Sequence, residues 1–147
     1  VVKDVLQRLG KAPPTLVWFQ SRALFEALGP YMKVYGSGSD APQAPAHHAA
    51  VSIAVHSKGK NLQAWAHNLV IEPPSSGATW EQMLGRTHRM GQKADEIFVD
   101  FYTHTSRLTG AVMKAAQEAV YIQQLHGMQQ RLTASVWSGI ARPAWLR

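Results

Sequence analysis

Short apolar runs alternate along the chain with segments of helical periodicity, and this alternation limits the fold more than any other feature. Runs that are apolar on both faces are typical of buried parallel strands, and helices between such strands cover the two faces of one sheet. We therefore predict an α/β domain of three layers, with a mainly parallel sheet of about five strands flanked by helices. The predicted strands cover residues 15–19, 33–35, 51–55, 68–71 and 97–102.

The predicted helices are marked by apolar side chains that recur every three or four residues, and by residues that begin or end helices. Thr79 and Gln82 fit a capping box, so one helix is predicted to begin at Thr79 and to end near Gly91. One or two helical turns are also predicted within residues 61–67. The other predicted helices cover residues 2–9, 22–28 and 106–125.

Two stretches lack this periodicity. Residues 36–50 are dominated by Gly, Ser, Pro and Ala, and are predicted to form a flexible loop. Residues 133–147 have no clear period and are predicted to be a C-terminal tail, which leaves residues 1–132 as the domain. The chain begins with Val1 inside a predicted helix, so we expect a piece of a longer protein.

The composition restricts the partners. The chain has a net charge of +6, and 46% of its residues are hydrophobic. A basic balance favours polyanions such as nucleic acids, although many small domains are basic without such a partner. The absence of cysteine excludes disulfides and thiolate metal sites, and no apolar run approaches the ~20 residues of a membrane span. No metal site is predicted, because the adjacent His47 and His48 point apart and no third ligand has a suitable spacing.

Ligands of parallel sheets bind at the carboxyl ends of the strands. The residues after each predicted strand are therefore the first candidates for function, and so is the helix into which the fourth strand leads. These candidates are residues 20–22, residues 56–61, the segment from Glu72 onward, and the helix from Gln82 to Arg89.

Three polar side chains of that helix share one face, because Gln82, Arg86 and Arg89 are spaced i, i+4 and i+7. Arginine stays charged and offers a planar fork of donors, so two arginines beside an amide suit a triphosphate. An arginine supplied across a cleft stabilises the charge that develops during phosphoryl transfer. The spacing alone also fits a solvated basic helix face, on which Gln82 only closes the capping box.

Three segments resemble motifs of superfamily-two helicases, in the expected order. QMLGRTHRMGQ, residues 82–92, closely resembles motif VI, and its closing His-Arg-x-Gly-Gln is similar to the Swi/Snf-type branch. HSKGKNLQAWAHNLVIEPP, residues 56–74, resembles motif V and the strand after it, and TLVWFQS, residues 15–21, resembles motif IV. The resemblance covers roughly residues 12–105 and implies the second, C-terminal RecA-like lobe of such an enzyme.

The resemblance implies an ATP site that is shared by two lobes. Arg89 is expected to be the catalytic arginine finger that reaches the γ-phosphate, and Arg86 its catalytic partner at the phosphates. Gln82 is expected to contact the nucleotide, and Gly59 belongs to the motif V turn that couples the nucleotide to the bound strand. Lys60 stands where the family usually has an apolar residue, which indicates a differently configured motif V.

The resemblance also implies an edge that binds nucleic acid. Phosphate contacts from Lys, Ser and backbone amides give affinity without sequence preference. The Swi/Snf-like motif VI favours translocation on duplex DNA over strand separation of RNA. The residues expected at this edge are Gln20, Ser21, Arg22, Ser57, Lys58, Lys60 and Asn61.

No glycine-rich phosphate loop ending in Gly-Lys-Ser/Thr occurs in the chain. ATP with Mg²⁺ is therefore expected to be held mainly by a first lobe of the same protein, and the chain alone is expected to be inactive as an ATP-dependent helicase or translocase. An intracellular location, in the cytoplasm, nucleoid or nucleus, is expected. Three alternatives stay open: an RNA helicase lobe, a non-catalytic nucleic-acid-binding module of the same fold, and an α/β protein whose motif VI is a coincidence.

Overall fold

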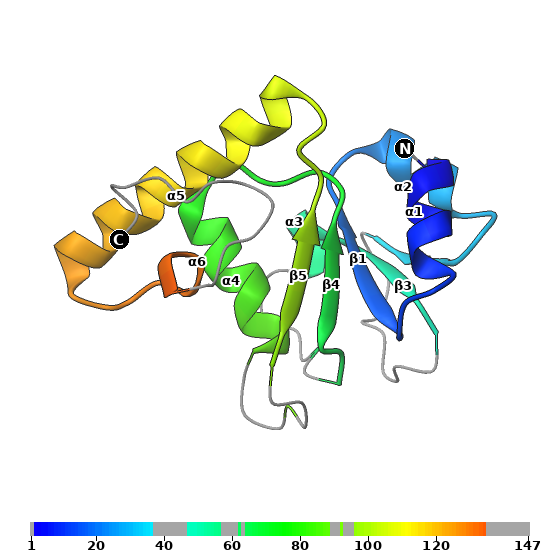
Figure 1. The fold of residues 1–147 in the computed structure, drawn as a ribbon, viewed down its shortest axis with the longest axis horizontal. Coiled ribbons are helices and arrows are strands. Elements are labelled where there is room, and N and C mark those ends of the chain that lie inside the picture. The colour runs from blue at the N-terminus through cyan, green and yellow to red at the C-terminus, as the bar shows by residue number, and fades with distance from the viewer. Residues whose placement is uncertain are drawn as a thin grey trace.

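Five parallel strands form one sheet in the order β2-β3-β1-β4-β5 (Figure 1). The computed structural model describes residues 2–36, 47–56, 64–88 and 96–134, together with Leu62 and Gln92. The strands are β1 (Thr15–Phe19), β2 (Lys33–Tyr35), β3 (Ala49–Ser52), β4 (His67–Val70) and β5 (Phe98–Phe101).

The first strand lies at the centre of the sheet. All residues of β1 are buried, whereas the edge strands β2 and β5 are only partly buried. Leu16 of β1 lies opposite Ala49 of β3 on one side and opposite Asn68 of β4 on the other. A strand that is buried on both faces reads as a continuous apolar run, as this one does. The predicted parallel sheet of about five strands is confirmed.

Helices cover both faces of the sheet and complete three layers (Figure 1). Val17 and Phe19 of β1 pack on one face with residues of the first two helices, and Leu16 and Trp18 pack on the other face with the later helices. The first face carries α1 (Val2–Leu9) and α2 (Arg22–Leu28); the second carries α4 (Gly77–Thr87), α5 (Ser106–His126) and α6 (Arg131–Ala134).

The third strand is shifted relative to its prediction. Residues 51–55 are predicted as strand, but β3 begins at Ala49, and Ile53–His56 form the short helix α3. Ala49 and Ala50 have little intrinsic strand preference, yet they pair with both β1 and β2. A short apolar run does not distinguish a buried strand from a buried helical turn, and here the pairing with two neighbours sets the boundary.

The start of α4 also differs from its prediction. The helix begins at Gly77, and its N-cap is Ser76, whose Oγ accepts a hydrogen bond of 3.2 Å from the backbone N–H of Thr79. The predicted start at Thr79 and its capping box with Gln82 are therefore wrong. Ser76 supplies the same kind of cap one turn earlier, because a serine oxygen can accept from the first free amides of the helix.

Three other helix predictions concern this half of the chain. α4 ends with His88 as its C-cap, and Gly91, its predicted end, lies outside the described residues. Among the described residues of the segment 61–67, none is helical. The long helix predicted at 106–125 is confirmed as α5, and it ends at Gly127 in the left-handed conformation, with φ of 70°.

The predicted loop and tail lie largely outside the described residues, which exclude 37–46 and 135–147. Within the predicted loop 36–50, Ala49 and Ala50 belong to β3. α6, which was not predicted, begins at Arg131, just before the predicted tail. No helix in the described part of the chain is long and apolar enough to cross a membrane.

His48 joins the end of α1 to the start of β1. Its Nδ1 accepts a hydrogen bond of 3.0 Å from the backbone N–H of Thr15, and its Nε2 lies 2.9 Å from the carbonyl oxygen of Leu9. Because a backbone amide donates and a carbonyl accepts, Nε2 carries the hydrogen. Both ring nitrogens are thus used within the fold. The described residues contain no group of three or more His, Cys, Asp and Glu side chains that could hold a metal.

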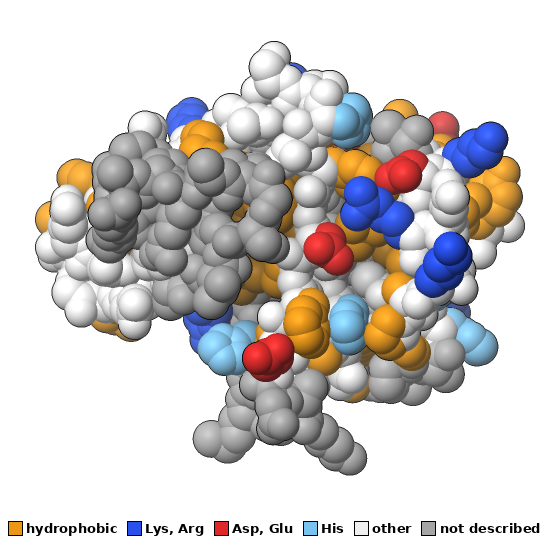
Figure 2. All heavy atoms as spheres, viewed as in Figure 1, with side chains coloured by type: hydrophobic (Ala, Val, Ile, Leu, Met, Phe, Trp, Pro, Cys, Tyr) orange, Lys and Arg blue, Asp and Glu red, His pale blue; other side chains and the backbone are white. Residues whose placement is uncertain are grey.

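A hydrogen-bonded cluster ties α1 to the end of β5. The hydroxyl of Tyr102 donates to the Asp4 carboxylate at 2.5 Å, and Arg8 Nε donates to the same oxygen at 3.1 Å. The Arg8 guanidinium also lies 5.0 Å from the centre of the Tyr102 ring. On this side of the molecule acidic and basic side chains lie interspersed (Figure 2). The hydrogen bond from Tyr102 holds the pKa of Asp4 below its usual value, and burial, followed by that hydrogen bond, raises the pKa of Tyr102.

This cluster makes the stability depend on pH at both extremes. A carboxyl group with a lowered pKa in the fold stabilises above its unfolded pKa of about 4, and this contribution is lost as the pH falls through the folded value. A phenol with a raised pKa stabilises below its unfolded pKa of about 10, and this contribution is lost as the pH rises further. We expect Tyr102→Phe to unfold at a lower urea concentration than the unmodified chain at pH 7. Below pH 4 and above pH 10, the variant should lose less further stability than the unmodified chain does. Identical pH profiles for the two proteins would contradict the coupling.

Candidate functional site

The two ends of α4 lie at opposite ends of the parallel strands, which are called the carboxyl edge and the amino edge of the sheet below. Gly77, its first residue, follows the carboxyl end of β4. Thr87 is its last residue, and Thr87 Oγ1 accepts a hydrogen bond of 3.4 Å from the Nδ2 of Asn68, near the start of β4. The 11 residues of α4 span about 16 Å. The expectation that the candidate residues gather at the carboxyl ends of the strands is therefore wrong for Arg86, which lies toward the amino edge.

Arg86 and Gln82 are brought together on one face of α4. Arg86 Nε donates a hydrogen bond of 3.0 Å to the backbone carbonyl of Gln82, which lays the guanidinium along the helix surface. Both residues are half-buried. A cation in the last turn of a helix also interacts favourably with the negative end of the helix dipole, so Arg86 has a structural use as well. Arg89, the third residue of the predicted face, lies outside the described residues.

The end of α4 is hydrogen-bonded to the segment that precedes β4. The backbone N–H of Leu62 donates to the carbonyl oxygen of Arg86 at 3.1 Å. The side-chain amide of Gln92 donates to the carbonyl oxygens of Trp65 and Thr87, at 2.7 and 3.1 Å. Residues from the segments that resemble motifs V and VI are thus directly joined, so displacing one segment perturbs the other.

A second set of contacts holds α4 from the side of α6. Arg131 Nη1 donates to Glu81 Oε1 at 2.5 Å, and the Arg131 backbone N–H donates to Glu81 Oε2 at 2.7 Å. The same guanidinium passes Gly85 and lies 3.4 Å from the carbonyl oxygen of His88, the C-cap of α4. Arg131 therefore fixes the part of α4 that carries Arg86. No local sequence signal pairs Glu81 with Arg131, because the two residues meet only in the folded chain.

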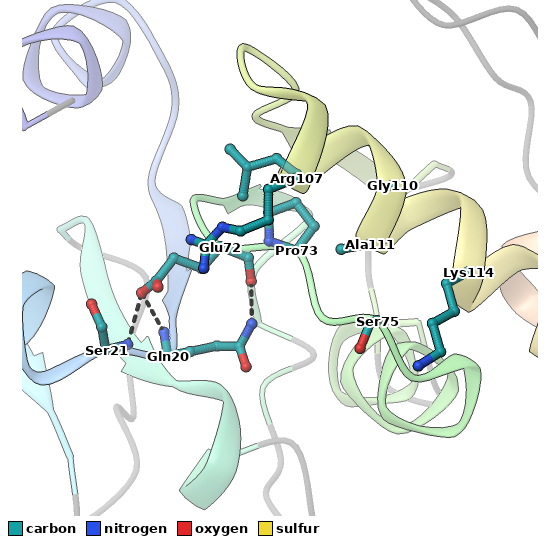
Figure 3. Close-up of a pocket in the computed structure, with 10 residues that line it drawn as sticks. Gln20, Ser21, Glu72, Pro73, Ser75, Arg107, Gly110, Ala111 and Lys114 are labelled. Atoms are coloured by element: carbon teal, nitrogen blue, oxygen red, sulfur yellow. Dashed lines mark hydrogen bonds between the residues drawn. The ribbon is translucent and has the colours of Figure 1, made fainter.

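At the carboxyl edge, Glu72 joins the ends of β1 and β4. Its Oε1 accepts hydrogen bonds from the backbone N–H groups of Gln20 and Ser21, at 2.9 and 2.7 Å (Figure 3). The Gln20 side chain returns a bond of 2.8 Å to the Glu72 carbonyl oxygen. Two of the residues predicted to contact nucleic acid are thus held in place by the residue that follows β4.

The remaining groups of this motif IV segment have distinct roles. Ser21 Oγ accepts a hydrogen bond of 3.3 Å from the backbone N–H of Leu24 and so caps α2. A serine hydroxyl that accepts in this way still has its own hydrogen to donate. Arg22 is exposed and lies 3.3 Å from the Glu26 carboxylate, an ion pair of little energetic weight.

The carboxyl edge also carries an open pocket of about 530 Å³. It is bounded by Gln20 and Ser21 after β1, by the turn that contains Glu72 and Ser75, and by one face of α5 (Figure 3). That face includes two cations that are not among the predicted site residues. They are Arg107 and Lys114. Their spacing of seven positions on a predicted helix places them on one side of it, but only the fold shows that this side faces β1 and β4.

Six predicted site residues lie outside the described part of the chain, so their roles stay predictions. Arg89 is one; the other five belong to the segment that resembles motif V, namely Ser57, Lys58, Gly59, Lys60 and Asn61. The described residues next to them, Leu62 and His88, lie at the end of α4.

Comparison with known proteins bears on the fold. No sequence profile of a known family matches the chain, and no curated protein sequence matches it. The crystal structure of the C-terminal part of the Fun30 ATPase domain is similar, with a TM-score of 0.57 at 16% sequence identity. The similarity covers 78% of this chain and 43% of that one, so this chain spans less than half of that structure. The predicted α/β fold, a RecA-like arrangement with a parallel five-stranded sheet flanked by helices, is confirmed.

Proposed function

We propose that this chain is the second motor lobe of an ATP-dependent DNA helicase or translocase. The observation that carries the proposal is the position of Arg86. It lies at the end of a helix whose sequence resembles motif VI, on a RecA-like fold. Leu62 donates a hydrogen bond to its backbone carbonyl, and Arg131 contacts the neighbouring Glu81 and His88. These contacts hold the part of α4 that carries Arg86 and so support a fixed position for its guanidinium.

In this proposal, Mg-ATP is held by a first lobe of the same protein. The protein that contains both this first lobe and the present chain is called the two-lobed protein below. Closure of the lobes brings Arg86 and Arg89 to the γ-phosphate, with Gln82 beside the nucleotide. Fixed guanidinium groups then stabilise the charge that develops as the phosphoryl group is transferred.

The coupling to nucleic acid runs, in this proposal, through the segment before β4. Ser57, Lys58, Lys60 and Asn61 contact the nucleic-acid backbone, and Gly59 lets the segment turn. The bond between Leu62 and the carbonyl of Arg86 supports such coupling, because it joins this segment to the end of α4. Gln20, Ser21 and Arg22 extend the contact edge to the end of β1.

The test is ATP hydrolysis by the two-lobed protein, measured alone, with duplex DNA and with RNA. We expect turnover that duplex DNA stimulates more than RNA, and no turnover by the 147-residue chain alone. Stimulation by RNA and not by DNA would identify an RNA helicase instead. Nucleic-acid binding without any hydrolysis by the two-lobed protein would leave a non-catalytic binding module.

A further inference from the structure

The pocket at the carboxyl edge is lined by cations without partners among the described residues. Arg107 and Lys114 both border it, and both are exposed. Neither side chain has a hydrogen bond or an ion pair to any described residue. Arg107 extends from α5 toward Glu72 and the end of β4, and Lys114 extends toward the turn at Ser75 (Figure 3). Two cations therefore converge on one hollow from the same helix.

The helix surface between the two cations carries only small side chains. Gly110 and Ala111 also line the pocket, and with the cations they form a stripe at i, i+3, i+4 and i+7 along α5. A methyl group added at Gly110 would meet no atom within 4 Å, so packing does not require a glycine there. Glycine inside a helix is unfavourable relative to alanine, because it loses more backbone freedom on folding. The residue that is unfavourable for the helix leaves room for a ligand to approach its backbone.

The position of Arg107 is also unfavourable without a ligand. It lies in the first turn of α5, where the helix dipole is positive and a cation is disfavoured. The one carboxylate of the pocket, Glu72, already accepts hydrogen bonds from two backbone N–H groups. Two cations thus face a single carboxylate whose charge is partly satisfied. A bound anion would relieve the repulsion between Arg107 and the helix end.

We propose that this pocket binds the phosphodiester backbone of nucleic acid, with Arg107 and Lys114 as its phosphate ligands and the hydroxyls of Ser21 and Ser75 as additional donors. This assignment rests on the proposed function as a motor lobe and extends its contact edge from β1 across β4 to α5. Side chains of this kind recognise phosphates without reading the bases. The surface across α5 therefore positions the strand and does not select its sequence.

The test is the binding of a fluorescent DNA duplex to the 147-residue chain, measured by anisotropy. The salt concentration is varied over about one decade, from roughly 0.05 to 1 M. Each lost phosphate contact lowers the slope of log affinity against log salt by about 0.9. Arg107→Ala with Lys114→Ala is expected to lower the slope by about 1.8. Because counterion release contributes nothing near 1 M salt, this corresponds to about 60-fold weaker binding at 0.1 M.

The matched control removes two cations elsewhere. Lys3 and Lys33 are exposed and lie outside the pocket, so Lys3→Ala with Lys33→Ala changes the net charge equally. We expect binding within about twofold of the unmodified chain, since charges farther than about 10 Å are screened at 0.1 M salt. Gly110→Leu provides a test without any charge change: it fills the pocket from an open helix position and should weaken DNA binding while the chain stays folded.

Equal losses in the pocket double variant and the control would overturn the proposal, as would unchanged binding by Gly110→Leu. If inorganic phosphate displaces the duplex in the same concentration range in which DNA binds, the pocket is a site for free phosphate instead. If these variants bind normally while the two-lobed protein still shows DNA-stimulated hydrolysis, the pocket assignment alone fails. If the two-lobed protein shows no such hydrolysis, the motor function fails, whatever the variants do.

Discussion

Arg86→Ala is expected to lower DNA-stimulated ATP turnover by the two-lobed protein about 10³-fold, while nucleotide binding is retained. The reason is that a fixed guanidinium stabilises charge present mainly in the transition state, so its removal reduces the rate more than the affinity. Arg86→Lys should rescue little, because an ammonium group lacks the planar fork of donors. Turnover under saturating ATP and duplex DNA is the measurement, with nucleotide affinity determined separately.

A purely structural role for Arg86 makes a different prediction. Its bond to the Gln82 carbonyl and its place at the helix end would then account for the residue, and Arg86→Ala would lower the unfolding temperature slightly without affecting turnover in the folded protein. Lys3→Ala is the matched control, since Lys3 is exposed on α1, away from the end of α4. Turnover equal to that of this control would remove Arg86 from the motor site.

The contacts at the end of α4 hold the backbone that carries Arg86, which is what the proposed role of this arginine requires. Leu62 and Gln92 hold the helix end from the side of β4, and Arg131 holds it from the side of α6. A guanidinium that acts across a cleft must keep its position when the cleft opens. Contacts to two separate segments meet that need better than a single ion pair on the helix surface.

The central strand and the long helix could be predicted from the sequence, because each depends on local patterns. The residues of β1 are all apolar or β-branched, and α5 keeps a helical period over its whole length. The boundaries of β3 and α4 could not be predicted in the same way. Ala49 enters a strand because two neighbours pair with it, and Gly77 enters a helix that is capped by Ser76 and packs closely against α5.

The residues of the candidate site also differ in whether local sequence patterns could predict them. Gln82 and Arg86 could be predicted because helical spacing and a motif place them on one face. Arg107 and Lys114 could not, since their relevance depends on which face of α5 turns toward β1 and β4. Glu81 and Arg131 are likewise paired only by the docking of α6 on α4. One sequence without aligned relatives carries no signal for such distant pairs.

Gly77→Ala is expected to be among the most destabilising single substitutions in the chain, with a loss of about 3 kcal/mol and a fall in unfolding temperature of roughly 10 °C. A methyl group at Gly77 would lie 2.7 Å from the carbonyl oxygen of Ala115 and 2.7 Å from the backbone nitrogen of Ala119. Both atoms belong to the backbone of α5, so the overlap cannot be relieved by a side-chain rotation. α4 or α5 must move as a body, and the bond from the Gly77 N–H to Glu118 would be strained with it.

The same chemical change at Gly110 serves as the control and should have the opposite sign. Gly110 lies inside α5 with open space around its α-carbon, so Gly110→Ala removes the cost of a helix glycine and is expected to stabilise by about 0.5–1 kcal/mol. Thermal and urea unfolding of the two variants measure both effects. A Gly77→Ala variant as stable as Gly110→Ala would mean that α4 and α5 are not in close backbone contact, and the placement of Arg86 by a tightly docked α4 would lose its basis.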